Sequence, residues 1–165
     1  PYNHRRQRQM CIRDSHPRDL LKLLRQIQDA DFVLGSRIQG NREQGAMPAQ
    51  AVLGNQLACW LMKRIWSAEY TDLGPFRVIR YQRLLELGMK DQNFGWTIEM
   101  QIKAKLANLR TVEVPVSYRR RVGVSKISGT VSGTIRAGYK ILYTVAKFSL
   151  QNGSGRKYGT HQNPV

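Results

Sequence analysis

The sequence has few acidic residues, few cysteines and no long hydrophobic run. It holds 11 Asp and Glu against 27 Lys and Arg, which gives its 165 residues a net charge of +16. Two cysteines cannot build a disulfide framework, and the absence of CxxC and HExxH motifs gives no sign of a zinc site. No run of 18 apolar residues occurs, so no transmembrane helix is predicted. With 41% hydrophobic residues, the chain is long enough to fold as one domain with a core.

The positive charge is concentrated at the two ends of the sequence. Residues 1–13 carry four arginines and no acid, and residues 114–165 carry nine basic residues and no acid. Residues 14–113 are nearly balanced, with 14 basic and 11 acidic residues. This distribution predicts a folded body whose C-terminal side faces an anionic partner. Phosphates, lipid head groups and nucleic acid are the candidates.

Hydrophobic periodicity predicts alternating helices and strands between residues 16 and 150. The expected helices lie within 16–30, 51–68, 81–89, 98–109 and 131–150, and the expected strands within 30–37, 70–80 and 111–121. This order predicts an α/β sandwich with a mostly parallel or mixed sheet. Residues 1–15 have no such pattern and are interpreted as a non-native or disordered leader, and 151–165 as a disordered tail.

Two of the predicted helices have an apolar side that can be read from the spacing. The helix at 51–68 places five apolar residues on one side: Leu53, Leu57, Trp60, Leu61 and Ile65. The helix at 131–150 has an apolar side and a basic side, formed by Ile135, Tyr139, Leu142 and Ala146 and by Arg136, Lys140 and Lys147 respectively. An amphipathic basic helix of this kind lies either on an anionic membrane surface or against the core.

Four segments carry the most specific signal, because they occur in a fixed order and spacing. They are ADFVLGSR (30–37), TDLGPFRVIR (71–80), GWTIEMQIKAK (95–105) and EVPVSYRRRVGVSKISGT (113–130). Together they resemble family 2 glycosyltransferases, in particular the polyprenyl- or dolichyl-phosphate hexose synthases. The resemblance covers residues 16–150 and implies the C-terminal portion of a GT-A domain, a three-layer α/β sandwich with a mixed sheet.

The resemblance also implies an activity and a location. The family moves a hexose from a nucleotide sugar, UDP-glucose or GDP-mannose, to a polyprenyl phosphate such as dolichyl or undecaprenyl phosphate. The protein would then work at the cytoplasmic face of an anionic membrane, peripherally or as part of a longer membrane protein. A family 2 enzyme that glycosylates a polysaccharide or another acceptor is the alternative within this class.

A leaving nucleoside diphosphate and a phosphate acceptor both require cations. The resemblance assigns phosphate binding to five residues: Arg37, Arg119, Arg121, Ser125 and Lys126. The last four lie in YRRRVGVSK, a segment that in the family closes over the donor and acceptor phosphates. A solvated basic edge strand is the alternative for that segment, and an ordinary surface arginine is the alternative for Arg37.

Four other residues match the family near the acceptor. Asp72 matches a carboxylate described as catalytic, which would orient the ligands because a phosphate acceptor is already ionised. Arg77, Trp96 and Glu99 fall in the acceptor region. The structural alternatives are an Asx turn for Asp72, a helix-start acid for Glu99 and a core position for Trp96.

The expected metal site is not intact in this sequence. The family binds Mg²⁺ or Mn²⁺ with a DxD motif, and the spacing places its two aspartates at Cys11 and Arg13. A guanidinium repels the cation that this position should hold. The strands that bind the nucleotide base are missing as well, so we expect little or no turnover from this chain alone.

A nucleic-acid-binding protein is the alternative from another class, suggested by the charge of +16. The sequence has no RNP, KH or helix-turn-helix pattern, and its basic residues gather beside GVSK and on the last helix. We therefore expect a nucleotide sugar, a polyprenyl phosphate and a membrane surface as partners, and no nucleic acid.

Overall fold

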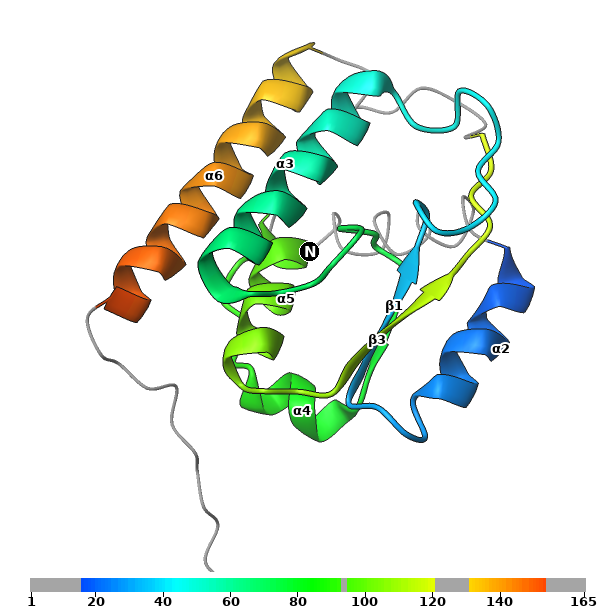
Figure 1. Ribbon diagram of the computed structural model, residues 1–165, viewed down its shortest axis with the longest axis horizontal. Helices are drawn as coiled ribbons and strands as arrows, with labels where there is room; N and C mark the ends of the chain where they lie inside the picture. The colour runs from blue at the N-terminus through cyan, green and yellow to red at the C-terminus, as the bar shows by residue number, and fades with distance from the viewer. Residues whose placement is uncertain (1–15, 93–94, 121–130, 154–165) are drawn as a thin grey trace, which may run out of the picture.

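The computed structural model describes residues 16–92, 95–120 and 131–153, which form three strands and five helices (Figure 1). In chain order the elements are α2 (Pro17–Gln26), β1 (Phe32–Ser36), α3 (Ala49–Trp66), β2 (Arg77–Ile79), α4 (Tyr81–Glu86), α5 (Trp96–Leu106), β3 (Thr111–Pro115) and α6 (Val131–Gly153). Each predicted element is present. The last helix continues to Gly153, three residues beyond its expected end.

The strands form a mixed sheet in the order β2-β1-β3. β1 pairs in parallel with β3, with Val33 opposite Val112, and antiparallel with β2, with Val33 opposite Val78. Both β1 and β3 therefore end at the same edge of the sheet. The predicted α/β fold with a mixed sheet is confirmed, and β3 ends at Pro115, whose ring cannot donate to a ladder.

Helices cover both faces of the sheet, because side chains alternate along β1. Val33 points to one face, where it packs with Leu23 of α2. Phe32 and Leu34 point to the other face, where they pack with Met100 of α5. In Figure 1, α2 lies on one side of the sheet and α5 on the other. The alternation typical of a strand thus produces two separate hydrophobic clusters.

A second layer of helices lies outside α5. Helices α3 and α6 run side by side along it (Figure 1), and buried residues of all three helices form one cluster that includes Met62, Ile98 and Phe148. Both α3 and α6 begin at the end of the molecule where β1 and β3 end. The side of the predicted three-layer sandwich that contains α5 therefore has two layers of helices, with α3 and α6 outside α5.

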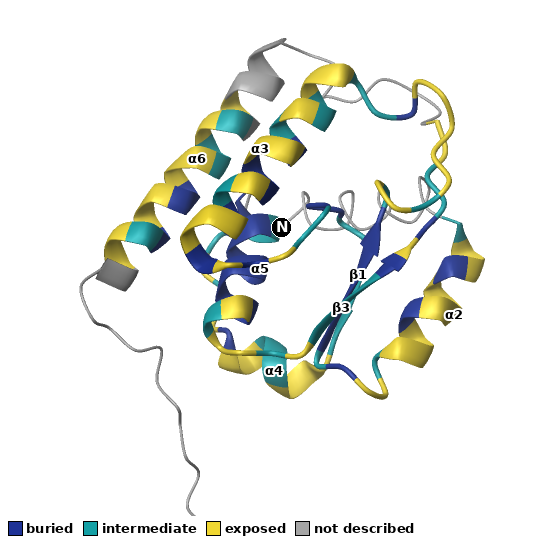
Figure 2. Ribbon diagram, viewed as in Figure 1, coloured by how far each residue is buried: buried dark blue, intermediate teal, exposed yellow. Residues whose placement is uncertain are grey.

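Most of the apolar residues that the spacing had grouped lie on the outer sides of α3 and α6. Leu61 is an exception, because it packs against the core, and the side chain of Ile135 lies outside the described residues. Leu53, Leu57 and Trp60 are exposed, and α3 instead buries Ala58 and Met62. On α6, Tyr139, Leu142 and Ala146 are exposed, while Val145 and Phe148 are buried, so this side does not pack against the core. Figure 2 shows exposed residues along α3 and along the part of α6 whose burial is described.

Candidate functional site

The candidate site lies where β1 and β3 end. Their parallel pairing continues beyond the strands, since Val116 N donates to Ser36 O (3.1 Å) and Tyr118 N donates to Asn41 O (2.9 Å). Gly40 allows this approach, because a side chain there would place its Cβ 2.1 Å from Val116 O. The segments after the two strands are thereby held next to each other. Carboxyl ends of strands are the usual ligand-binding edge of an open α/β sheet.

Arg37 and Asp72 form the central ion pair of this edge. Asp72 Oδ2 accepts from the Arg37 backbone N and from its Nε, both at 2.8 Å, and Asp72 Oδ1 accepts from Nη2 at 2.7 Å. Burial disfavours the charged guanidinium, but the hydrogen bonds and charge of Asp72 more than compensate and raise the pKa of Arg37. The structure therefore brings together two residues that the sequence proposed separately, 35 positions apart.

Two buried amides fix the segment that carries Asp72. Asn55 of α3 donates to Thr71 O (3.1 Å) and accepts from Leu73 N (2.7 Å), so its side chain bonds on both sides of the aspartate. Gln101 of α5 donates to Asp72 O (2.9 Å). These bonds fix the backbone on both sides of Asp72, and the bonds from Arg37 orient its carboxylate. The carboxylate is therefore held in position rather than free to rotate into solvent. The Asx-turn alternative does not describe this carboxylate, whose oxygens bond to Arg37.

Glu113 of β3 is a second carboxylate at this edge, and the sequence analysis did not identify it. It accepts from Thr71 N (3.0 Å) and Thr71 Oγ1 (2.7 Å), and from Gln39 Nε2 (3.2 Å). Burial, together with the charge of Asp72, raises the pKa of Glu113 despite these hydrogen bonds. In the sequence, Glu113 is visible only as an acid between two valines of a predicted strand.

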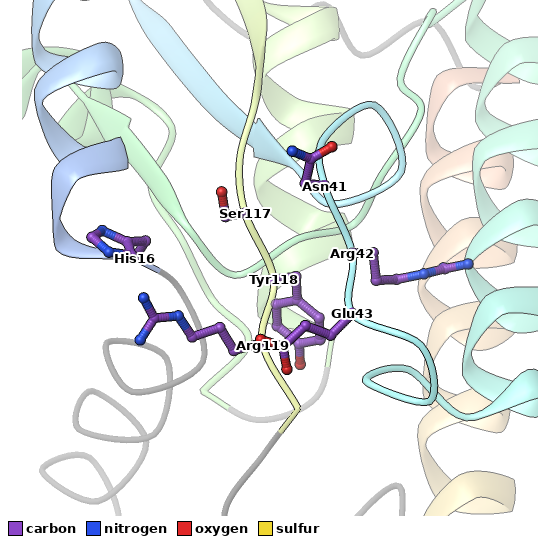
Figure 3. Close-up of a pocket in the computed structure, with 7 residues that line it drawn as sticks. All are labelled: His16, Asn41, Arg42, Glu43, Ser117, Tyr118 and Arg119. Carbon is purple, nitrogen blue, oxygen red and sulfur yellow. The ribbon is translucent and has the colours of Figure 1, made fainter.

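A pocket of about 330 Å³ opens beside the ion pair. The Arg37 guanidinium lies 5.2 Å from the centre of the Tyr118 ring, and Tyr118 lines the pocket. The other lining residues are His16, Asn41, Arg42, Glu43, Ser117 and Arg119. Figure 3 shows Arg119 extending toward His16 and Arg42 extending the other way, toward α3. The structure thus places the predicted residue Arg119 in a pocket that also contains Arg42 and Glu43 and that adjoins Arg37 through Tyr118.

Arg77 and Trp96 lie apart from this pocket, around the start of α5. The Arg77 guanidinium donates to Gly74 O and to Thr97 O (3.1 Å) and lies 5.6 Å from the Trp96 ring centre. These contacts tie the segment after Asp72 to α5. The Arg77 side chain therefore connects to the Asp72 segment through Gly74 O, and Trp96 is connected to it through its ring contact with Arg77.

Glu99 is a buried structural acid in this structure. It pairs with Lys103 (2.7 Å) and accepts from the backbone N of Lys90 (3.0 Å) and of Asp91 (2.6 Å). Burial would raise the pKa of Glu99, but the hydrogen bonds from Lys103 and from the two backbone groups outweigh it, so the pKa is lowered. The carboxylate has its partners within the fold, which agrees with the structural alternative.

Several predicted residues lie outside the described residues. These are Arg121, Ser125 and Lys126 of the basic loop and the two DxD positions, Cys11 and Arg13. Within the described part, no three His, Cys, Asp or Glu side chains gather closely enough to hold a metal ion. The Asp72 carboxylate is already bonded to Arg37. Cys11 and Arg13, at the two DxD positions, are poor ligands for Mg²⁺, so the donor set does not fit this ion.

Known relatives of this chain are glycosyltransferases. Uncharacterized glycosyltransferases of Mycobacterium bovis and Mycobacterium tuberculosis are each 35% identical to it over 123 residues, which cover 72% of this chain and 55% of the relative. The predicted resemblance to glycosyltransferases is therefore confirmed at the level of homology. No family model matches the chain, and no solved structure matches it.

One relative has a more specific name. The undecaprenyl-phosphate mannosyltransferase of Micrococcus luteus is 28% identical over 126 residues, which cover 71% of this chain and 50% of that protein. The chain spans about half the length of the curated relatives it matches. Its mixed α/β fold is consistent with part of such an enzyme.

Proposed function

We propose that this chain is the acceptor- and phosphate-binding portion of a family 2 glycosyltransferase with a GT-A fold, which transfers a hexose to a polyprenyl phosphate. The observation that carries the proposal is Arg37, held by three hydrogen bonds to Asp72 at the edge where β1 and β3 end. Tyr118 lies against Arg37, and the next residue, Arg119, lines the same pocket as Tyr118 and is the first residue of RRRVGVSK. The name of the Micrococcus luteus relative supports the same acceptor class.

The chemistry needs anchored cations more than it needs a base. An oxygen of the acceptor phosphate forms a bond to C1 of the hexose, while the bond from C1 to the nucleoside diphosphate breaks. The acceptor is already ionised, so no proton has to be removed. Negative charge develops on the leaving diphosphate, and fixed cations lower the energy of that state.

Arg37 and Arg119 are suited to this role in different ways. Arg37 is oriented by Asp72, which we propose acts as a positioning residue, whereas Arg119 is exposed in the pocket. We propose that Arg121, Ser125 and Lys126 complete the phosphate site. Mg²⁺ or Mn²⁺ remains an expected requirement of the complete enzyme, with ligands from outside this portion, and we expect this chain alone to be inactive.

The test is transfer of labelled sugar to lipid by the full-length protein that contains this chain. The protein is incubated with radiolabelled GDP-mannose or UDP-glucose, undecaprenyl phosphate and Mg²⁺, and the lipid is extracted. Labelled lipid with either donor supports the proposal, and the productive donor identifies the hexose and nucleotide. Absence of labelled lipid with both donors, or label appearing only in polysaccharide, would overturn it in this form.

Substitution of two arginines, one before and one after β3, distinguishes a specific role in phosphate binding from a general effect of positive charge on the transfer rate. Arg119→Ala should lower transfer about 10²-fold, the scale observed when one preorganised transition-state donor is lost. Arg110→Ala removes another exposed arginine, which lies directly before β3, and should leave the rate unchanged. Equal rates for the two variants would contradict the assignment. Salt-sensitive binding of nucleic acid without sugar transfer would instead favour the other class of protein.

A further inference from the structure

Glu113 is a carboxylate on the face of the sheet that packs against α5. In the parallel pairing of β3 with β1 it lies opposite Leu34, so both side chains point to this face. An apolar residue would fit the position at a lower free energy, because burial disfavours a charged carboxylate. A polar residue that is costly to bury, at the edge of a candidate site, indicates a role that an apolar residue could not fill.

Hydrogen bonds join Glu113 to two segments that are distant in the sequence. Its Oε2 accepts from Thr71 Oγ1 (2.7 Å) and from Gln39 Nε2 (3.2 Å). Both carboxylate oxygens also accept from the backbone N of Thr71, at 3.0 and 3.1 Å. These donors are uncharged, so they hold the carboxylate in place without neutralising it.

The Thr71 hydroxyl extends this network to Ser36, whose Oγ lies 2.8 Å from Thr71 Oγ1. A hydroxyl has one proton and an ionised carboxylate can only accept, so Thr71 donates to Glu113 and Ser36 donates to Thr71. Ser36 Oγ in turn accepts from Gln39 N (3.2 Å), and the Gln39 side chain returns to Glu113. We call this closed set of four residues the Glu113 ring.

The other members of the Glu113 ring stand next to the central ion pair along the chain. Thr71 directly precedes Asp72, and Ser36 and Gln39 lie on either side of Arg37. Ser36 is fully buried, so its bond to Thr71 joins the two segments inside the fold. The ring therefore sets how the two segments face each other, and with them the arrangement in which Arg37 makes three hydrogen bonds to Asp72.

We propose that Glu113 is a positioning residue for sugar transfer, which it supports through Ser36 and Thr71 by keeping Arg37 oriented. The inference rests on the proposed function and adds a residue that the motifs did not indicate. Glu113 itself does not have to touch a substrate. Arg37 acts on negative charge that develops as the diphosphate leaves, so its misorientation raises the barrier to transfer more than it weakens substrate binding.

The first test follows the orientation of Arg37 and needs no substrate. NMR measures the exchange of its Nε–H with solvent in the purified chain, since this proton is bonded to Asp72. Glu113→Gln keeps the side-chain shape but turns one acceptor oxygen into a donor, and it should speed this exchange about tenfold. The control is the Arg80 Nε–H, which donates to Ala30 O (3.0 Å) before β1 and should exchange as in wild type.

The second test measures kcat and KM for sugar transfer by the full-length protein. Glu113→Gln should lower kcat about tenfold and change KM for the lipid acceptor less than about twofold, because the lost orientation matters in the transition state. Circular dichroism gives the folded fraction, and kcat is corrected for it, so a loss of folding alone leaves the corrected kcat at the wild-type value. A raised KM with unchanged kcat would overturn the proposal.

Variants of Thr71 keep the test valid if Glu113→Gln folds poorly. Thr71→Val removes the hydroxyl and should lower kcat about tenfold, whereas Thr71→Ser keeps it and should stay within about threefold of wild type. Thr111→Val is the matched control, because it removes a β3 hydroxyl that donates to Leu109 O, and it should leave kcat unchanged. Glu113→Gln combined with Thr71→Val should be no slower than either single variant, since both open the same ring. Losses that multiply to about 100-fold would overturn the proposal.

The two tests distinguish failure of this inference from failure of the proposed function. Unchanged exchange at Arg37 in folded Glu113→Gln and Thr71→Val protein would overturn the positioning role and leave the proposed transfer standing. Faster exchange with unchanged kcat would also overturn it, because the ring would then be structural only. A wild-type protein that transfers no sugar would overturn the proposed function and the role in transfer together, and the exchange result would still report whether Glu113 orients Arg37.

Discussion

Two buried ion pairs include residues that the family resemblance assigned to the site, namely Arg37, Asp72 and Glu99, and the pairs differ in what they can do. Lys103 and Glu99 are 2% and 4% exposed and are bonded to the backbone of residues 88–91. Arg37 and Asp72 are 13% and 1% exposed, and the arginine lies against a ring that lines a pocket. The first pair is enclosed by the fold, whereas the second presents an oriented cation near solvent. A charged motif residue in the core is therefore not by itself a site residue.

The largest expected effect comes from breaking the enclosed pair. Glu99→Ala leaves the Lys103 ammonium buried without its carboxylate, which should lower the free energy of unfolding by about 3–5 kcal/mol. Urea unfolding followed by circular dichroism measures this difference. Glu86→Ala is the control, because its pair with Arg83 is exposed and should contribute little. Similar losses in the two variants would show that the α5 pair does not have the predicted importance.

Asp72→Asn should lower the free energy of unfolding less than Glu99→Ala does, and it should lower the rate of sugar transfer more. Asparagine retains one acceptor for Arg37, so we expect a loss of about 1.5–3 kcal/mol, the range for hydrogen bonds to charged groups. In the full-length protein, misorientation of Arg37 should lower sugar transfer about 10²-fold. Folded Glu99→Ala protein should retain its transfer rate after correction for the folded fraction. The reverse pattern, in which Glu99→Ala abolishes transfer and Asp72→Asn retains it, would contradict the assignment of Arg37 and Asp72 to the site.

Much of the fold could be predicted from the sequence, because each helix and strand has a local pattern. The alternation of strands and helices was visible as changing periodicity, and Pro115 indicated the end of β3. The packing side of α3 could not be predicted in the same way. Apolar residues occur all around this helix, so the spacing that grouped Leu53 with Trp60 described its outer side. Which side packs inward is decided by the neighbouring α5 and α6.

The candidate site could be predicted only in part, for a similar reason. Motifs identified Arg37 and Asp72 one at a time, but their bond joins residues far apart in the sequence. Glu113 was missed because its partner Thr71 lies 42 positions away, and no local pattern records this contact. Residue chemistry suggests what a side chain can bind, while the tertiary fold decides what it does bind.

A smaller effect is expected where the backbone approaches the site closely. At Gly74 an added Cβ would lie 2.7 Å from Gly35 O and 3.0 Å from Asp72 Oδ2. Gly74→Ala should therefore lower the free energy of unfolding by about 1–3 kcal/mol. Gly54→Ala on α3 has open space around the new methyl group and should raise stability by about 0.5–1 kcal/mol. Urea unfolding of both variants measures the contrast, and equal signs would contradict it.

The smallest expected effect is a difference in how the stability contributions of Glu99, in the enclosed pair, and Glu113, at the site edge, depend on pH. The pKa of Glu99 lies below its ordinary value of 4.5, so its contribution to stability is present above 4.5 and is lost as the pH falls through the lowered pKa. The pKa of Glu113 lies above 4.5, so the folded state binds this proton more tightly than the unfolded state does. Ionisation of Glu113 therefore removes stability as the pH rises from 4.5 through the raised pKa.

Replacing each acid by glutamine should reveal these opposite signs. The stability advantage of wild type over Glu99→Gln should widen with rising pH, while its advantage over Glu113→Gln should narrow. Unfolding by urea at several values between about pH 3.5 and about pH 7 measures both differences. Parallel trends would mean that burial and the charge of Asp72 do not outweigh the hydrogen bonds that Glu113 accepts. Opposite trends would show that the enclosed pair stabilises the charge of Glu99, while burial at the site edge, together with the charge of Asp72, disfavours the charge of Glu113.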